Sequence, residues 1–293
     1  MAFRARQSDG LEVVIKLTRG RNSYPVEQWV YEKYDRAGVP TPQVLYYCAT
    51  LPTIGCPCLV MTMINGIPPF KTDEQYAGLF GEAGELLGKM HSVKVLEQRF
   101  GLGAFLPSAE AEQFDSWLEF VTTQHSYPES GEHLSRYGLW PFVTGDRCLL
   151  GVKIASHRFR RVVNHGDFGP DHLLVRAGKI AGVIDPGDAF IGPPEYDLAH
   201  IALYISGHQM AQLLSHYPGE PDLEMIHVYA AIIALHKASR AHQDGHAARA
   251  SRFAHLARGA YQRVGQLDAL SHGSELPIGL PPGRNIELDK TQR

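Results

Sequence analysis

The stretch NHGDFGPDHLLV, from Asn164 to Val175, decides the fold. It places two histidines, two aspartates and two glycines directly before an apolar run. A second β-rich run, IAGVID at 180–185, follows after Ala177-Gly178, so the two runs predict a β-hairpin. Antiparallel strands joined by a short turn begin and end on the same side, and this hairpin therefore brings Asp167 and Asp185 together. Either aspartate alone is typical of a turn or a helix cap, but the pair indicates a functional site.

The spacing within this stretch is typical of phosphoryl transfer from ATP. That reaction needs one carboxylate at the incoming hydroxyl and further ligands that hold a metal ion against the phosphates. Asp167 occupies the aspartate position of an H-x-D-x-x-x-x-N-like pattern, His172 stands at the asparagine position, and Asp185 ends the hairpin. We therefore expect Asp167 to be the catalytic base and His172 and Asp185 to be metal ligands. We expect His165 to orient the loop backbone.

A lysine within an apolar run marks a second part of the site. Lys16 lies in VVIKL at 13–17, where a charge is costly unless it has a partner. Glu27, on the following predicted helix, is the expected partner, and such a pair positions nucleotide phosphates in kinases. The stretch LVMTMINGIP at 59–68 predicts a hinge, with the backbone of Met61 to Met63 binding adenine.

The remaining patterns predict a small sheet with one helix, followed by a mainly helical part. Residues 1 to about 66 contain a hairpin around Ser8-Asp9-Gly10, a helix at 25–38 and strands at 43–49 and 57–64. Helical patterns cover 73–91, 108–135 and the region from Pro194 to about Leu270. Residues 271–293 are rich in proline, glycine and charge, which predicts a loose tail.

Taken together, these blocks resemble the aminoglycoside phosphotransferase family of kinase-like enzymes. The matching blocks are HGD at 165–167, Ile184-Asp185, PEYDLA at 194–199, the hinge ending at Gly66, and LLGKMHSV at 86–93. The similarity to the family covers roughly residues 2–265. The resemblance implies an α+β, two-lobed protein-kinase-like fold. It places an N-terminal nucleotide-binding lobe at 1–66, and a larger, mainly helical catalytic and acceptor-binding lobe at 67–270.

The chain departs from the family pattern in three places. Family members begin with an additional strand and a phosphate-covering loop, whereas this chain starts at what should be the second strand, so we expect the sheet to lack its first strand. Pro186 replaces an aromatic residue after the metal aspartate. His172 replaces asparagine, as in the similar macrolide kinases. The resemblance implies ATP and Mg²⁺ as cofactors, with Mn²⁺ as the alternative because imidazole suits it better.

The acceptor is indicated by charge alone. Between Arg99 and Arg136 there is no lysine or arginine, and the acidic residues include Glu110, Glu112, Asp115 and Glu119. In the family this region helps form the acceptor pocket, so an acidic wall predicts a cationic acceptor such as an aminoglycoside. A solvated helix face explains the same charges equally well. The alternatives are a macrolide kinase, a housekeeping small-molecule kinase, or a non-catalytic nucleotide- or ligand-binding relative that lacks the glycine-rich loop.

Composition excludes several other classes of function. The chain has 293 residues and a net charge of −3, which gives no general attraction to nucleic acid or to anionic membranes. Its four cysteines are too few for a disulfide scaffold and predict free thiols in a reducing compartment. No signal peptide and no membrane-spanning run is visible. We therefore expect a cytoplasmic monomer or homodimer whose partners are ATP and a small-molecule acceptor.

Overall fold

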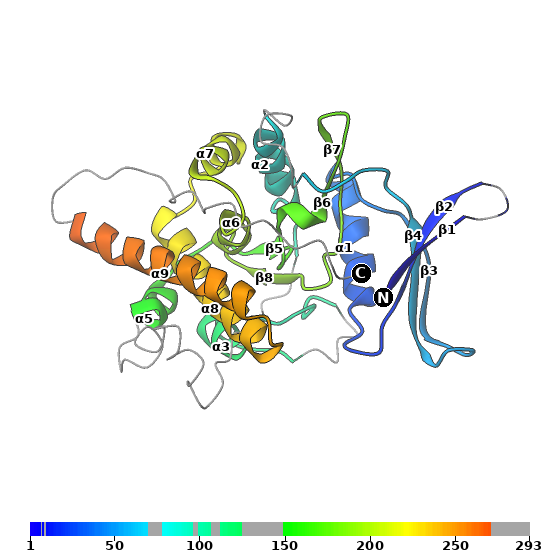
Figure 1. The fold of residues 1–293 in the computed structure, drawn as a ribbon, viewed down its shortest axis with the longest axis horizontal. Helices are drawn as coiled ribbons and strands as arrows, with labels where there is room; N and C mark the ends of the chain where they lie inside the picture. Colours follow the sequence, from blue (N-terminus) through cyan, green and yellow to red (C-terminus); the bar gives the residue numbers. More distant parts are fainter. Residues whose placement is uncertain are drawn as a thin grey trace.

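The computed structural model describes residues 1–6, 8, 10–69, 78–95, 99–106, 112–124 and 149–270. A four-stranded antiparallel sheet lies at one end of the molecule and most of the helices lie at the other (Figure 1). Two short hairpin-like sheets and one helix, α1, lie between them. This arrangement confirms the predicted α+β fold. The predicted tail at 271–293 lies outside the described residues.

The N-terminal sheet carries Lys16. Its strands are β1 (Ala2–Arg6), β2 (Glu12–Leu17), β3 (Val44–Leu51) and β4 (Cys56–Thr62), in the spatial order β1-β2-β4-β3. In this register Lys16 pairs with Ala2 on one side and with Leu59 on the other. The predicted hairpin and the two predicted strands after it are therefore confirmed.

Helix α1 (Tyr24–Arg36) packs against this sheet. Pro25 lies in its first turn, where the missing amide hydrogen costs nothing, and the helix ends next to Gly38, whose φ is +75°. Tyr24 and Tyr31 pack with Leu59 and with Met61 in a small apolar cluster. The packing turns the first-turn residue Glu27 away from water, as its exposure of 1% shows.

A central hairpin joins the sheet to the helical part. Strands β6 (Leu173–Arg176) and β7 (Lys179–Val183) are antiparallel, as predicted, and Ala177 and Gly178 form their turn with positive φ angles. The segment after β4 crosses to this hairpin, because Ile67 and Val175 exchange backbone hydrogen bonds of 3.0 and 2.8 Å. Strands β5 (Val162–Asn164) and β8 (Phe190–Gly192) pair beside it. The sequence predicted neither, since three residues are too few to show an alternation.

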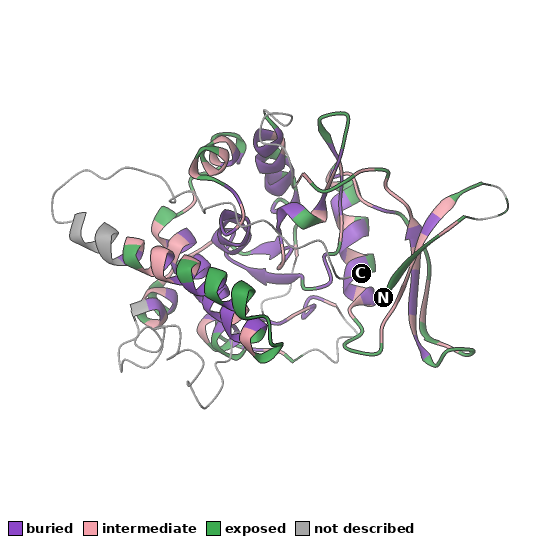
Figure 2. Ribbon diagram, viewed as in Figure 1, coloured by how far each residue is buried: buried purple, intermediate pink, exposed green. Residues whose placement is uncertain are grey.

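The helical part is built around one long buried helix. It contains α2 (Leu79–Met90), α3 (Trp117–Gln124), α5 (Leu149–Ser156), α6 (Glu195–Ala202), α7 (Gly207–His216), α8 (Leu223–Gln243) and α9 (Ala247–Leu270). Helix α8 packs on both α6 and α9. Buried residues cover α6 and most of α8, whereas α9 is exposed along one side (Figure 2). The predicted helix at 108–135 is confirmed only over α3, because much of that span lies outside the described residues.

Other expectations concern thiols and membranes. Cys48, Cys56 and Cys58 are free thiols, as predicted, and the last two are buried. Within the described ranges, no helix combines the length and the apolar character needed to cross a bilayer.

Candidate active site

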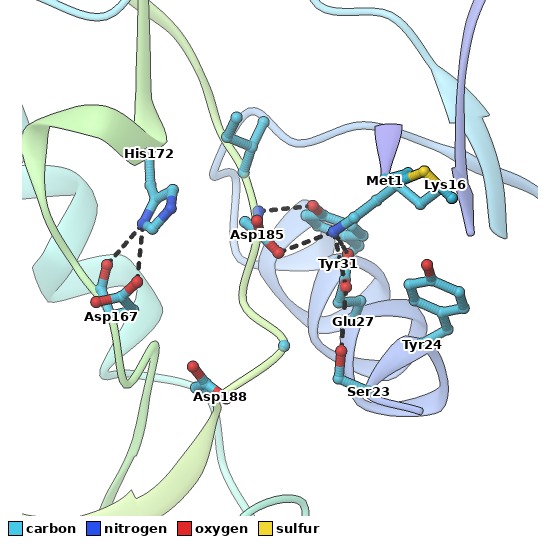
Figure 3. Close-up of polar contacts among 12 residues, drawn as sticks. Met1, Lys16, Ser23, Tyr24, Glu27, Tyr31, Asp167, His172, Asp185 and Asp188 are labelled. Atoms are coloured by element: carbon cyan, nitrogen blue, oxygen red, sulfur yellow. Dashed lines mark hydrogen bonds and ion pairs between the residues drawn. The ribbon is translucent and has the colours of Figure 1, made fainter. Parts of the chain in front are cut away.

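Lys16 bridges two carboxylates that come from distant parts of the chain. Its Nζ lies 2.8 and 2.7 Å from the two carboxylate oxygens of Glu27 and 2.8 Å from Asp185 Oδ1 (Figure 3). Burial alone would lower the pKa of Lys16, but the two carboxylates outweigh it and raise this pKa above its ordinary value. The lysine therefore stays charged, and the predicted Lys16–Glu27 pair is present.

Asp185 is held in an unusual backbone conformation. Its φ of +65° lies in the left-handed region, which residues other than glycine seldom adopt. Its amide donates to the Tyr31 hydroxyl at 2.8 Å, and its carboxylate accepts from Lys16. Burial would raise the pKa of Asp185, but the charge and hydrogen bond of Lys16 hold it below the ordinary value. Such strain at an ionised carboxylate is typical of functional sites.

Asp167 lies across the site, on the loop that follows β5 (Figure 3). Its Oδ1 is 2.7 Å from His200 Nε2 and 3.3 Å from Lys237 Nζ. Its Oδ2 has a more distant neighbour, His172 Nδ1 at 3.9 Å, and the side chain is 36% exposed. Burial would raise the pKa of Asp167, but the hydrogen bond and charge of His200, with the charge of Lys237, hold it far below the ordinary value. Oδ1 is thus held by two close partners, whereas among the described residues Oδ2 has only the longer approach of His172.

The sequence did not reveal His200 or Lys237. Helix α6 carries His200, whose Nδ1 lies 3.0 Å from the Phe168 carbonyl oxygen. Carbonyl and carboxylate oxygens only accept hydrogen bonds, so the ring of His200 lies between two acceptors. Lys237 comes from α8, 70 residues beyond Asp167. A histidine directly after the PEYDLA block was a usable signal, but nothing in the sequence pointed to Lys237.

Asp197 fixes the loop that carries Asp167. Its carboxylate accepts hydrogen bonds from the amides of His165 at 2.7 Å and Gly166 at 3.0 Å, and His91 Nε2 lies 3.2 Å away. This gives the PEYDLA block a structural role. Gly166 has a φ of +85°, and a side chain there would overlap the Asp188 carbonyl oxygen. His165 Nε2 donates to the Ile184 carbonyl oxygen at 3.0 Å, which ties the loop to the hairpin.

His172 presents one ring nitrogen to the centre of the site. Its Nδ1 donates to the Asp167 backbone carbonyl oxygen at 2.7 Å, which leaves the Nε2 lone pair available for a metal. The Ile184 amide donates to the His172 carbonyl oxygen at 3.0 Å, so His172 and Asp185 lie at the same end of the hairpin. No group of three histidine, cysteine or acidic side chains able to hold a metal occurs in the described part of the chain. Two donors suit a magnesium ion that is completed by phosphates and water.

The predicted hinge lies at the end of β4 and in the segment that follows it. Met61 lies within β4, where it pairs with Val14 on one side and Val44 on the other. The Met63 amide donates to the Glu12 carbonyl oxygen at 3.1 Å. Both amides therefore serve the sheet, whereas the amides of Ile64 and Asn65 donate to no other described residue. The amides of Ile64 and Asn65, beyond the end of β4, are therefore available to a ligand within the described part of the chain.

The acidic span is only partly described. Glu110 lies outside the described residues, Glu112 and Asp115 precede α3, and Glu119 lies on α3. In the described structure none of these three has a hydrogen bond or ion pair with Asp167. Helix α3 instead packs against α5. No direct contact therefore links the described acidic residues to Asp167, and their predicted place in an acceptor pocket stays a prediction.

A sheet-borne lysine paired with glutamate, opposite a loop aspartate and a hairpin aspartate, defines a kinase-like phosphotransferase. Comparison with known families agrees. The model of the phosphotransferase enzyme family, APH, matches residues 2–228, and the chain belongs to this family. It is thus a member of a class of small-molecule phosphotransferases. No curated protein sequence is a significant match to the chain.

Solved structures share the fold at low identity. A thermostable mutant of aminoglycoside phosphotransferase APH(4)-Ia, in a ternary complex with AMP-PNP and hygromycin B, is 17% identical with a TM-score of 0.65, over 89% of this chain and 93% of that one. The GDP complex of aminoglycoside 2'-phosphotransferase-IIIa is 16% identical with a TM-score of 0.57, and the match covers 90% of this chain and 93% of that one. Macrolide 2'-phosphotransferase MphH from Brachybacterium faecium is 16% identical with a TM-score of 0.52, and the match covers 87% of this chain and 86% of that one.

Proposed function

We propose that the protein transfers the γ-phosphate of ATP to a hydroxyl of a small molecule. The observation that carries this proposal is the joint placement of Lys16, Asp185 and Asp167. The Lys16–Asp185 pair is suited to binding a nucleoside triphosphate and its metal ion. The Asp167 Oδ2 oxygen, opposite this pair, is suited to accepting a hydrogen bond from an incoming hydroxyl. Dependence on ATP also agrees with the cytoplasmic location predicted from the sequence.

Each residue has a distinct role in this proposal. Lys16, held by Glu27, contacts the nucleotide phosphates, while Asp185 and His172 hold the metal. Magnesium, when bound, supplies positive charge that neutralises the phosphate oxygens. Asp167 Oδ2 accepts the hydrogen bond of the acceptor hydroxyl and takes its proton. The acceptor oxygen then forms a bond to the γ-phosphorus, the bond from that phosphorus to the β–γ bridging oxygen breaks, and ADP leaves.

The related structures support the nucleotide and the kind of acceptor. One of them holds AMP-PNP together with hygromycin B, and another holds GDP. We accordingly propose ATP as the donor, GTP as the nucleotide to compare with it, and a small hydroxyl-bearing molecule as the acceptor, with aminoglycosides and macrolides as the first acceptor classes to test. The acidic residues between Arg99 and Arg136 predict a cationic acceptor. The experiment in the next subsection compares this prediction with an anionic acceptor.

The test is nucleotide turnover across a panel of aminoglycosides, macrolides, amino-alcohols and hydroxy acids. We expect Asp167→Asn to lower the transfer rate by about 10²–10⁴, the usual effect of losing a positioned base. Nucleotide affinity should stay near the wild-type value because Asp167 acts on the acceptor. Asp35→Asn, at an exposed position on α1, is the matched control. Nucleotide binding without turnover on any acceptor would favour the non-catalytic alternative.

A further inference from the structure

A group of cations lies beside Asp167 on the side of α8 and α9. Lys237 Nζ is 3.3 Å from Asp167 Oδ1 and 5.8 Å from the centre of the Tyr204 ring. The Arg252 guanidinium lies 5.9 Å from the same ring. Arg249 acts on the nearby Asp171, whose pKa is raised mainly by burial and lowered in part by this arginine. Lys237, Arg249 and Arg252 together form a basic cluster next to the catalytic loop.

The position of this cluster relates it to the acceptor and not to the nucleotide. Lys16 and Asp185 approach the site from β2 and the end of β7, and Lys16 supplies the phosphate-binding charge there. Lys237 reaches Asp167 from α8, in the helical part of the molecule (Figure 1). The acceptor must contact Asp167 while its remaining atoms extend away from the phosphates. Lys237 therefore lies on the side of Asp167 away from the lysine that is suited to phosphates.

Neutralising Asp167 does not by itself account for Lys237. His200, which is buried, already places a hydrogen-bond donor 2.7 Å from the same oxygen, whereas the Lys237 contact is longer and its side chain is partly exposed. A lysine has a flexible stem and a compact charge, so its ammonium can move from Asp167 to a ligand at small cost. Arg249 and Arg252 are exposed, and neither forms an ion pair within 4.0 Å with another described residue.

We propose that the acceptor carries an anionic group, a carboxylate or a phosphate, close to the hydroxyl that is phosphorylated, and that Lys237 binds this group. This inference rests on the proposed phosphotransfer. It opposes the cationic acceptor predicted from the acidic span. Lys237 contacts Asp167 directly, whereas none of Glu112, Asp115 and Glu119 does among the described residues. An ammonium at this place attracts an anion and repels an amine on the same part of the acceptor.

The experiment compares acceptor classes at fixed ATP. Initial rates are measured for hydroxy acids, sugar phosphates, uncharged polyols and aminoglycosides with wild type, Lys237→Met and Lys237→Glu. We expect wild type to favour one of the anionic classes by at least about 10-fold in kcat/KM, and Lys237→Met to remove that preference mainly through acceptor KM. Lys237→Glu should invert it. Lys89→Met, an exposed lysine on α2, is the control and should behave as wild type.

Two outcomes overturn the inference while leaving phosphotransfer intact. The first is a wild-type preference for aminoglycosides that weakens when Glu110, Glu112, Asp115 and Glu119 are neutralised together. The second is an acceptor KM that is unchanged in Lys237→Met. Separate arms for carboxylates and phosphates show which anion is recognised.

Calorimetry separates failure of this inference from failure of the proposed function. The same anions are titrated into wild type and Lys237→Met in the presence of AMP-PNP. Anion binding that is lost in Lys237→Met, without transfer to any acceptor, would support the anion site and contradict the proposed reaction. Absence of both binding and transfer would overturn both.

Discussion

The two oxygens of Asp167 have different surroundings, and this difference shapes its chemistry. His200 and Lys237 hold Oδ1, whereas Oδ2 is left for the acceptor hydroxyl. A carboxylate with a strongly lowered pKa is a weak base, so in the proposed reaction Asp167 would act mainly by orienting the hydroxyl and would take the proton late in the transfer. His200 is accordingly a positioning residue, since it acts through Asp167.

Replacing His200 should change the pH dependence of the reaction. The folded-state pKa of Asp167 is lowered, so Asp167 stays ionised until the pH falls far below the ordinary carboxyl range. His200→Ala removes a hydrogen bond and a charge and raises this pKa. We expect kcat to fall roughly 10-fold or more, and the acid limb of kcat/KM to move to higher pH. Lys237 and His172 still face the carboxylate, which limits the shift.

The measurement is a pH–rate profile of wild type, His200→Ala and His200→Gln. Glutamine can donate to Asp167 without carrying a charge, so its acid limb should lie between the other two. Profiles that superimpose for all three proteins would show that His200 does not position Asp167.

His172 should set the metal preference. Its Nδ1 is held by the Asp167 carbonyl oxygen, so Nε2 is the ring nitrogen that could bind a metal ion. Imidazole suits Mn²⁺ better than Mg²⁺, which prefers oxygen. We expect higher activity with Mn²⁺ than with Mg²⁺ at equal free metal, and His172→Asn should reverse the order. Metal titrations in the presence of AMP-PNP give an independent reading of the same preference.

Asp171 is the alternative candidate for the metal ligand, and its substitution gives the result that would contradict a role for His172. It lies next to His172 in the chain, and its carboxylate is an oxygen donor. An unchanged Mn²⁺/Mg²⁺ ratio in His172→Asn, together with an altered ratio in Asp171→Asn, would make His172 a bystander.

At the scale of secondary-structure elements, helix α6 acts as the support of the catalytic loop. Asp197, in its first turn, accepts from two loop amides, and its neighbour His91 directly follows α2. The three segments therefore meet at one buried carboxylate. The amides that donate to Asp197 are removed from water. Losing these hydrogen bonds would therefore lower the stability of the fold, because the amides would remain buried without an acceptor.

Substitution of Asp197 should destabilise the fold as well as the site. We expect Asp197→Ala to lower the free energy of unfolding by about 3–5 kcal/mol, because it strands buried donors. Asp197→Asn keeps one acceptor oxygen and should cost less. Urea unfolding gives the values, with exposed Asp35→Ala as the control. A loss below about 1 kcal/mol in Asp197→Ala would contradict the supporting role.

At the scale of the whole molecule, Lys16 connects parts of the chain that are 169 residues apart. Strand β2, helix α1 and the end of the central hairpin meet at its ammonium group. Under the proposed function, nucleotide binding and folding stability would depend on the same contacts. A ligand that binds the folded state stabilises it in proportion to its affinity, which makes the coupling measurable.

A double-mutant cycle tests this coupling. Lys16→Met leaves Glu27 buried without its cation and should lower the free energy of unfolding by about 3–5 kcal/mol. Glu27→Gln in the same chain should restore part of that loss, because it removes the stranded charge. Nucleotide KM should stay raised in both variants, and thermal stabilisation by AMP-PNP should shrink. Equal stability of the single and double variants would indicate that the pair is not coupled.

Local patterns predicted most of the elements. The hairpin of β1 and β2, helix α1, strands β3 and β4, and the hairpin of β6 and β7 each have a period or a turn signal within a few residues. Strands β5 and β8 escaped prediction because they are short and buried on both faces. The partner of the Met63 amide, Glu12, also could not be predicted, because it lies on a strand far back in the chain.

The sequence by itself determined the catalytic spacing. Asp167 and His172 precede the β6–β7 hairpin and Asp185 follows it, while Glu27 lies on the helix after the strand of Lys16, so short-range geometry places them. Only the tertiary structure decided what surrounds Asp167. His200 and Lys237 reach it from α6 and α8, whose packing follows from burying apolar faces far along the chain. Hydrophobic burial is not directional, so it sets which helices meet without marking in the sequence which polar side chains they bring together.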